Sequence, residues 1–591
     1  MNRWTAALAA FVVAAAALVA GAGAGTSGPP QGTQSDAAFA ASYATSGVTN
    51  VSATTQKTSC YTPEVEYLAG AGFPGYADGG GTLCSGAVNT GEDIGPYAQQ
   101  DVTNDPLLVK DHSESDIRVD PNNPNHLIGQ SKWFVNGQGY NHLLGIYESW
   151  DGGKTWSVQG HVPGYEGWTD NTDPVGAFDP WSNYYALLLP YMFYYDKDGN
   201  HKYSNGANLP NPTLPGEAIT VAVHPAALSQ TARNWRANDH VFDSPQAVTH
   251  DVDKQWIAID TNPSSPFYRR VYAMWVVYNS FNSDHPFVSW ARANRDGSHT
   301  PWSTPVELAS ISGYPFDQYL LPHVDGDGTV WTTSTLANPK QGGTVADITI
   351  TKSTDGGATW SDPLPVAANI RVPTYLNTTF REGIVNSFAV GKTKFAGSYP
   401  LYVTYEDQST GMSHVYLIAS YDGGHSWTSP VQVDDGDASD GTPGEALQPT
   451  VSVAPSGTVG VTFYDRRLPC PTSTSSEAAG SGIVFDPGTS SSPGTPWGRA
   501  NYCIDTAIQF YRPNLTPIGH NVRLSAHSWD PQLSTAHVSC ICSPAGFIGD
   551  YFGLDFGSTG YAYTTSVSTF DYAGENPKYH QQQIVARIAT P

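Results

Sequence analysis

The sequence predicts an all-β protein built from repeated sheets of similar size, and three observations lead to this expectation. Short runs rich in β-branched and aromatic residues recur along the chain, as at 270–278 and 457–465. Amphipathic helical periodicity is almost absent, and only 225–235 fits a short helix. An eight-residue motif also occurs three times. Since 591 residues exceed what one ordinary hydrophobic core organises, a repeated architecture is favoured.

The repeated motif reads Ser-x-Asp-Gly-Gly-x-Ser/Thr-Trp, and it predicts a hairpin turn. Its copies are SWDGGKTW (149–156), STDGGATW (353–360) and SYDGGHSW (420–427). Glycine accepts a positive φ without steric cost, and the Asp and Ser side chains can accept hydrogen bonds from N–H groups of the same turn. The Trp can pack its indole over the turn. We therefore expect Asp151, Asp355 and Asp422 to be structural, not catalytic.

The spacing of the motif predicts the size of the repeating unit. Asp355 and Asp422 lie 67 residues apart, and Asp296 in the degenerate copy NRDGSHTPW (294–302) lies 59 residues before Asp355. Such a period suits one four-stranded sheet per repeat, which is the unit of a β-propeller.

The chain is expected to have three parts. Residues 1–24 resemble a secretory signal peptide, because one positive charge precedes an apolar run and the small residues of a cleavage site. Residues 25–105 are expected to be a flexible lead-in with a disulfide between Cys60 and Cys84, and the propeller is expected to occupy 106–591, with a Ser/Gly/Pro-rich insertion near 470–500. An even number of cysteines suits disulfides in an exported chain, although the pairing of four of them stays open: Cys470, Cys503, Cys540 and Cys542. We expect a secreted, extracellular protein.

Charge and motif content exclude several classes of partner. The net charge of -25 repels nucleic acid and anionic membrane surfaces, so we expect neither as a partner, and we expect a monomer. No phosphate-binding glycine loop, nucleophile elbow or zinc-ligand spacing occurs, and no cofactor or metal is predicted. The acidic stretch 434–445 leaves room for a structural calcium ion, but its spacing is not that of an EF-hand and a solvated loop explains it better.

The repeats resemble the Asp-box, or BNR, repeat of sialidases and their relatives. Further segments resemble secreted bacterial proteins of this type: DPNNPNHLIGQS (120–131), TDPVGAFDP (172–180), DKQWIAID (253–260), TTFREG (378–383), LQPTVSVAPSGTVGVTFYDRR (447–467) and FIGDYFGL (547–554). The resemblance implies a propeller with six blades, whereas about 60–70 residues per blade would also allow seven.

A sialidase-like function would need arginines to hold a sugar carboxylate, because a guanidinium group binds a carboxylate in bidentate geometry. The resemblance points to Arg118, Arg381 and Arg467 as substrate-binding residues. Arg118 lies in Ile-Arg-Val-Asp instead of the usual Phe/Tyr-Arg-Ile-Pro, and it can equally be a charge paired with a nearby Asp. Arg381 and Arg467 can equally be structural ion pairs between blades.

The catalytic part of such a site would pair a Tyr nucleophile with carboxylates. The resemblance points to three catalytic residues: Tyr551 as the nucleophile, Glu382 as a catalytic carboxylate and Asp173 as the acid. Other aspartates fit the last role: Asp116, Asp170 and Asp253. Tyr551 can also be a core residue whose hydroxyl ties down a closing strand.

Two functions follow from these residues. The first is a secreted, sialidase-like glycoside hydrolase acting on sialic acid or a similar anionic sugar. The second is a non-catalytic propeller that binds a glycan or a protein at the same central depression. The position of the arginines distinguishes the two functions. Arginines that converge opposite a Tyr and a carboxylate would favour the hydrolase, whereas arginines dispersed between blades would exclude it.

Overall fold

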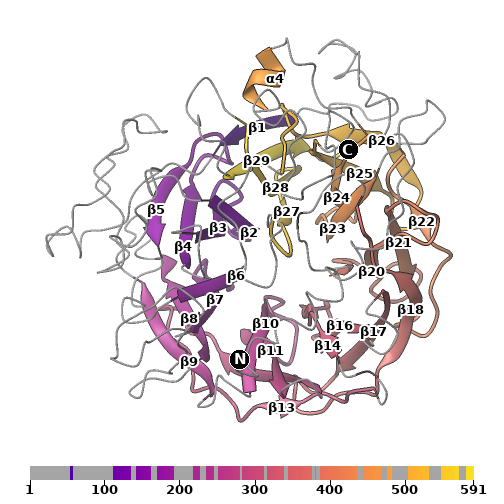
Figure 1. Ribbon diagram of the computed structural model, residues 1–591. Helices are drawn as coiled ribbons and strands as arrows, with labels where there is room; N and C mark the ends of the chain where they lie inside the picture. The colour runs from indigo at the N-terminus through magenta and orange to yellow at the C-terminus, as the bar shows by residue number, and fades with distance from the viewer. Residues whose placement is uncertain are drawn as a thin grey trace, which may run out of the picture.

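The computed structural model shows seven antiparallel sheets, or blades, arranged as a ring around a central axis (Figure 1). The structure describes these residues: 53–57, 111–134, 142–161, 170–191, 217–226, 235–244, 250–279, 283–311, 314, 316–337, 344–375, 380, 386–435, 445–467, 476–481, 503–531, 548–570 and 581–591. Within them the one α-helix is α4 (Ser476–Gly480).

Blades 1 to 3 each contain four strands, ordered from the axis outward as they occur along the chain. Blade 1 consists of β2 (Asp111–Val119), β3 (Leu127–Phe134), β4 (His142–Ser149) and β5 (Ser157–His161). Blade 2 consists of β6 (Asp170–Phe178), β7 (Tyr184–Tyr191), β8 (Glu217–His224) and β9 (Arg236–Ser244). Blade 3 consists of β10 (His250–Ile259), β11 (Arg270–Asn279), β12 (Asp284–Arg292) and β13 (Val306–Glu307).

Blades 4 to 6 repeat this order with one variation, because the innermost strand of blade 4 is split in two. Blade 4 consists of β14 (Phe316–Gln318), β15 (His323–Val324), β16 (Val330–Ala337), β17 (Val345–Ser353) and β18 (Leu364–Arg371). Blade 5 consists of β19 (Asn386–Val390), β20 (Leu401–Asp407), β21 (His414–Ser420) and β22 (Val431–Gln432). Blade 6 consists of β23 (Ala446–Val453), β24 (Val459–Asp465), β25 (Asp505–Tyr511) and β26 (Pro517–Arg523).

Blade 7 is completed by both ends of the chain. Its inner strands are β27 (Leu554–Gly557), β28 (Tyr561–Ser568) and β29 (Gln582–Ala589), and its outermost strand is β1 (Ala53–Lys57). β1 pairs antiparallel with β29, from Ala53 opposite Ile588 to Lys57 opposite Ile584. The propeller therefore includes a strand from the segment that the sequence suggested as a lead-in.

The three repeated motifs form the turns between the third and fourth strands of blades 1, 4 and 5. In the first copy the Ser149 hydroxyl accepts a 2.9 Å hydrogen bond from Gly153 N, and Asp151 Oδ1 accepts one of 2.9 Å from Thr155 N. The same pair of bonds recurs in the other two copies, with Asp355 and Asp422 as acceptors.

Each of these turns also packs against the preceding blade. A β-carbon at Gly153 would lie 2.9 Å from the Tyr563 ring of blade 7, and one at Gly357 would lie 3.1 Å from Trp290 of blade 3. Both glycines have positive φ. The second glycine of the motif is thus required by backbone conformation and by close inter-blade packing, which explains why the motif keeps it.

Hydrophobic side chains fill the spaces within and between the blades. One cluster joins blades 2 and 3 through residues such as Leu187, Val221 and Trp275, and another joins blades 5 and 6 through Leu417 and Phe463. Cys503 is disulfide-bonded, while the other cysteines lie outside the described residues. No helix in the described ranges has the length and hydropathy of a membrane-spanning segment.

The propeller has seven blades. The resemblance implied six, whereas the number of residues per blade also allowed seven. Motif spacing alone did not decide between them, because only three of the seven blades carry an intact copy of the motif. The remaining blades have other turns at this position.

Candidate functional site

The innermost strands carry a ring of residues with left-handed backbone around the axis. Four of these strands contain a β-bulge at the same position: β2, β6, β10 and β23. The bulges place Glu114, Asp173, Lys254 and Gln448 at φ values between 50° and 56°, and Tyr319 follows β14 with φ 60°. Positive φ is costly for residues other than glycine, and bulges concentrate near functional sites because they redirect side chains. The ring is therefore the candidate functional site.

Blade 7 contributes a glycine at the equivalent place. Gly549 has φ 106°, and a β-carbon there would lie 2.6 Å from the backbone nitrogen of Glu114 in blade 1. The Gln448 side-chain amide of blade 6 donates a 2.6 Å hydrogen bond to the Gly549 carbonyl. Asp550 and Tyr551 follow this glycine directly and lie near the axis.

Charged side chains from blades 1, 2, 3 and 7 meet inside this ring, and we call them the axial network. Its members are Glu114, Lys132, Asp173, Asp253, Lys254 and Asp550. Lys132 Nζ lies 2.6 Å from Glu114 Oε2 and 3.1 Å from Asp173 Oδ1, joining blades 1 and 2. Lys254 Nζ lies 2.9 Å from Asp550 Oδ2, 3.4 Å from Asp253 Oδ2 and 4.0 Å from Asp173 Oδ2. Four carboxyl groups thus share two ammonium groups.

Within the axial network, the pKa values of Glu114 and Asp173 are shifted in opposite directions. Burial raises the pKa of Glu114 well above its ordinary value, and the Asp173 charge raises it further. Burial also opposes ionisation of Asp173, but the charges of Lys132 and Lys254 outweigh it and hold the pKa of Asp173 well below its ordinary value. Two neighbouring carboxyl groups whose pKa values are shifted in opposite directions are the kind of pair that acid–base catalysis uses.

Tyr551 lies next to this network, with its hydroxyl donating a 2.9 Å hydrogen bond to the Pro174 carbonyl. Its ring packs edge-on against Trp256 with centroids 5.1 Å apart. Burial raises the pKa of Tyr551 well above its ordinary value, and the Glu114 and Asp173 charges add to this effect. Tyr551 is therefore a neutral phenol at physiological pH.

Two of the three expected arginines are described, and they lie apart. Arg118 Nη2 contacts Asp116 Oδ1 at 3.0 Å, and Arg118 Nε donates a 2.7 Å hydrogen bond to the Gly176 carbonyl of blade 2. Arg467 Nε contacts Asp465 Oδ2 and Arg467 Nη1 contacts Asp435 Oδ1, both at 2.6 Å, so this side chain joins blades 5 and 6. The structure does not bring these two guanidinium groups together.

The remaining expected residues have varied positions. Arg381 and Glu382 lie outside the described residues. Asp173 and Asp253 both belong to the axial network. Asp116 is the ion-pair partner of Arg118. Burial raises the pKa of Asp116 to about 6, although the charge of Arg118 opposes the shift. Asp170 begins β6. Most of the acidic stretch 434–445 also lies outside the described ranges, within which no group of His, Cys, Asp and Glu could hold a metal ion.

Sequence reasoning did not find Glu114, Lys132, Lys254 or Asp550. Two of them stand directly beside residues that it did consider, Lys254 after Asp253 and Asp550 before Tyr551. Lysines pair with acids on most protein surfaces, and only the bulges, which leave no clear mark in a sequence, direct these side chains inward.

Comparison with known proteins gives similarity of architecture only. No family model matches the chain, and no curated protein matches it in sequence. Among solved structures, a leech intramolecular trans-sialidase has 10% identity and a TM-score of 0.38 over 63% of this chain and 66% of that one. An intramolecular trans-sialidase from Ruminococcus gnavus has 12% identity and a TM-score of 0.39 over 70% and 94%. A Hadza microbial sialidase has 11% identity and a TM-score of 0.38 over 78% and 76%. At these values the chemistry of this chain must be argued from its own residues.

Proposed function

We propose that the protein is a glycoside hydrolase whose chemistry takes place at the axial network, with sialic acid or a similar anionic sugar as substrate. One observation carries the proposal. Asp173 and Tyr551, which the motif resemblance singles out as acid and nucleophile, are far apart in the sequence, but Tyr551 donates a hydrogen bond to the carbonyl of Pro174, the residue after Asp173. Both lie close to Glu114, whose pKa is raised.

The residues divide into chemical roles. Glu114, whose pKa is raised by burial, is the general acid available to the leaving oxygen. Tyr551 supplies the nucleophilic oxygen, and the ionised Asp173 is the base that takes its proton. Because nearby carboxylates disfavour a free phenolate, proton removal would accompany attack on the anomeric carbon. A neutral nucleophile also avoids repulsion with an anionic sugar.

Access to the network is through Asp253. The side chain of Asp253 is 26% exposed, whereas those of Lys254 and Asp173 are at most 10% exposed. Burial raises the pKa of Asp253, and Lys254 partly offsets the increase. A sugar would therefore first contact Asp253.

A specific observation favours a second candidate, a propeller that binds glycan or protein without chemistry. Tyr551 and all axial side chains except Asp253 are almost fully buried, and Arg467 is held by two carboxylates and by Asn521. Buried ion networks also serve to fix structure.

Release of a fluorescent leaving group from α-sialosides and from a panel of uronic and neutral glycosides separates the two candidates. We expect turnover by the parent protein to fall at least about 100-fold in Tyr551→Phe, which removes only the hydroxyl. Tyr563→Phe is the matched control, because its hydroxyl also donates to a backbone carbonyl, Gly152 O at 3.2 Å, but far from the axis. No turnover on any reporter, or equal turnover in both variants, would reject the hydrolase and leave the binding propeller.

A further inference from the structure

Two arginines stand directly opposite each other on the outer part of blade 3. Arg270 begins β11, Arg292 ends β12, and the two are cross-strand partners in the register of these strands. Like charges directly opposite in a sheet destabilise it. The pair is unusual in a chain with 53 acidic against 28 basic residues, where each arginine could have been given a carboxylate partner.

Neither arginine forms an ion pair within the described part of the chain. Arg270 Nη1 donates a 2.5 Å hydrogen bond to the Gly356 carbonyl in the repeated turn of blade 4, and its guanidinium lies 5.5 Å from the centre of the Trp290 ring. The carboxylate of Asp260 interacts electrostatically with Arg270 but lies beyond ion-pair distance. Arg292 is exposed, and within the described residues its side chain has no hydrogen-bond partner, while its backbone pairs with Thr300.

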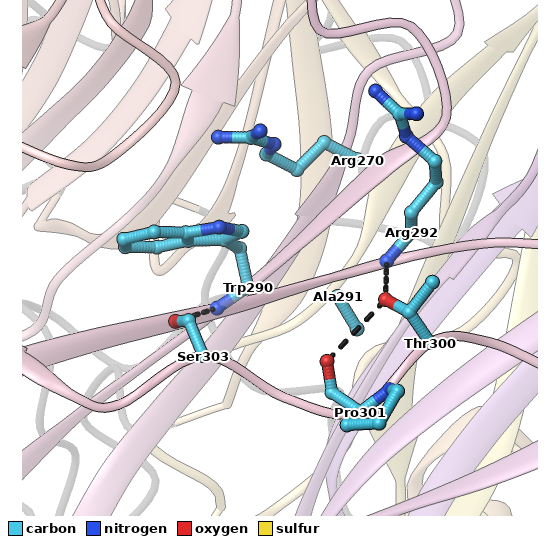
Figure 2. A pocket seen from close by; sticks show the side chains of 7 residues that line it. All are labelled: Arg270, Trp290, Ala291, Arg292, Thr300, Pro301 and Ser303. Carbon is cyan, nitrogen blue, oxygen red and sulfur yellow. Dashed lines mark hydrogen bonds between the residues drawn. The ribbon is translucent and has the colours of Figure 1, made fainter.

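The two side chains border a surface depression of about 430 Å³. Figure 2 shows Arg270 lying above the plane of the Trp290 indole and Arg292 extending beside it, with Thr300, Pro301 and Ser303 along the opposite edge. Those three residues belong to or follow the degenerate copy of the repeated motif. In that copy the tryptophan, Trp302, donates a 2.9 Å hydrogen bond to Asp239 of blade 2 instead of closing over its own turn.

We propose that this depression, the blade 3 edge site, binds an acidic polysaccharide through its carboxylate or sulfate groups. Arg270 and Arg292 are cross-strand neighbours, and their guanidinium groups supply donors that match the planar oxygens of a carboxylate or the oxygens of a sulfate. The indole offers an apolar surface for a sugar ring, and the volume suits one or two sugar units. An anion between Arg270 and Arg292 also removes the repulsion between them.

The surrounding charge favours a glycan over a nucleic acid. A net charge of -25 repels a polyanion of high charge density over long range, whereas one or two acidic groups on a sugar chain need only local compensation. The edge site lies at the start of β11, at the end of β12 and on the loop that follows β12. It does not depend on axial chemistry, so it would hold a polymer against the rim of the propeller.

Titration of the full chain with fluorescent polygalacturonate and chondroitin sulfate oligosaccharides tests the proposal. We expect binding that weakens with added salt and that falls at least about tenfold in Arg292→Gln, with no change in thermal unfolding. Arg512→Gln is the matched control, because Arg512 is an exposed arginine beside a turn of blade 6. The carboxylate and sulfate ligands together show which acidic group the site prefers.

Four results would overturn the edge site: no binding of either glycan, equal binding by Arg292→Gln and Arg512→Gln, equal binding of neutral dextran, or tighter binding of single-stranded DNA. Binding should persist in Tyr551→Phe. If that variant lost turnover but still bound the glycan, the axial hydrolase and the edge site would be shown to act independently. Either proposal can therefore fail without the other.

Discussion

Lys254 of blade 3 and Asp550 of blade 7 form an ion pair of 2.9 Å across the axis of the propeller. The residues are almost 300 positions apart, and both side chains are at most 10% exposed. Burial opposes the ammonium charge, but Asp253 and Asp550 keep the pKa of Lys254 well above its ordinary value. The pair therefore links non-adjacent blades by a charge interaction that solvent screens weakly.

Replacing Lys254 by Met should destabilise the fold strongly. The change leaves Asp550, Asp253 and Asp173 without their shared cation, and removing one partner of a buried pair typically costs about 3–5 kcal/mol. Urea unfolding followed by tryptophan fluorescence measures the loss. Lys394→Met is the control, because Lys394 pairs with Asp327 at 2.8 Å on the exposed surface and should have little effect. A similar loss of unfolding free energy in both variants would contradict a stabilising role for the buried axial pair.

Glu114→Gln should change how stability depends on pH. Because burial raises the pKa of Glu114, the folded protein holds a proton there that the unfolded chain releases near pH 4.5. Stability is therefore lost as pH rises above that value. The glutamine variant cannot ionise, so its stability relative to the parent should increase between pH 5 and pH 8. Thermal unfolding across this range is the measurement, and a constant difference would contradict the assigned protonation.

Asp422→Ala should cost about 1 kcal/mol, as loss of a turn-capping side chain usually does. Hydrogen bonds from the Ser426 hydroxyl and N–H lower the pKa of Asp422 to about 2. Its contribution is therefore present above the usual aspartate pKa and disappears as pH falls toward 2. Chemical unfolding at pH 6 and pH 2.5 should show a smaller difference between variant and parent at the lower pH. An unchanged difference would contradict this account of the turn.

Deleting residues 53–57 should expose the edge of β29 and destabilise blade 7. An unpaired edge strand promotes association between chains, so we expect both a lower melting temperature and more aggregation. Light scattering during a thermal scan follows both effects. A deletion of equal length in the turn 393–397 between β19 and β20 serves as a control within the ring. If the two deletions behaved alike, ring closure by β1 would not be a particular determinant of stability.

The repeated turns could be predicted in detail, because the hydrogen bonds of their Ser and Asp side chains join residues at most four positions apart. The Ser149, Asp151 and Gly153 arrangement depends on a few consecutive residues, and so do its two copies. The all-β class and the blade size followed from the same pattern.

The axial network could be predicted only in part, because it depends on contacts between distant blades. Asp173 and Tyr551 were expected at the site, but Lys132 and Glu114 were not, and nothing local shows that a bulge in β2 turns Glu114 toward Asp173. Arg467 illustrates the same limit. Its strand-end position suits a substrate-binding arginine and an ion pair between blades equally well, and only the three-dimensional positions of Asp435 and Asn521 show its present partners.

The pairing of β1 with β29 also determines the order in which the molecule can be completed. Residues 53–57 are synthesised more than 500 residues before their partners at 584–588. At the usual rates of translation, the interval between them is on the order of half a minute to two minutes. Throughout that time blades 1 to 6 can form in sequence while the first strand must wait without its partner. Closure of the ring by β1 thus has to wait until residues 584–588 have been made.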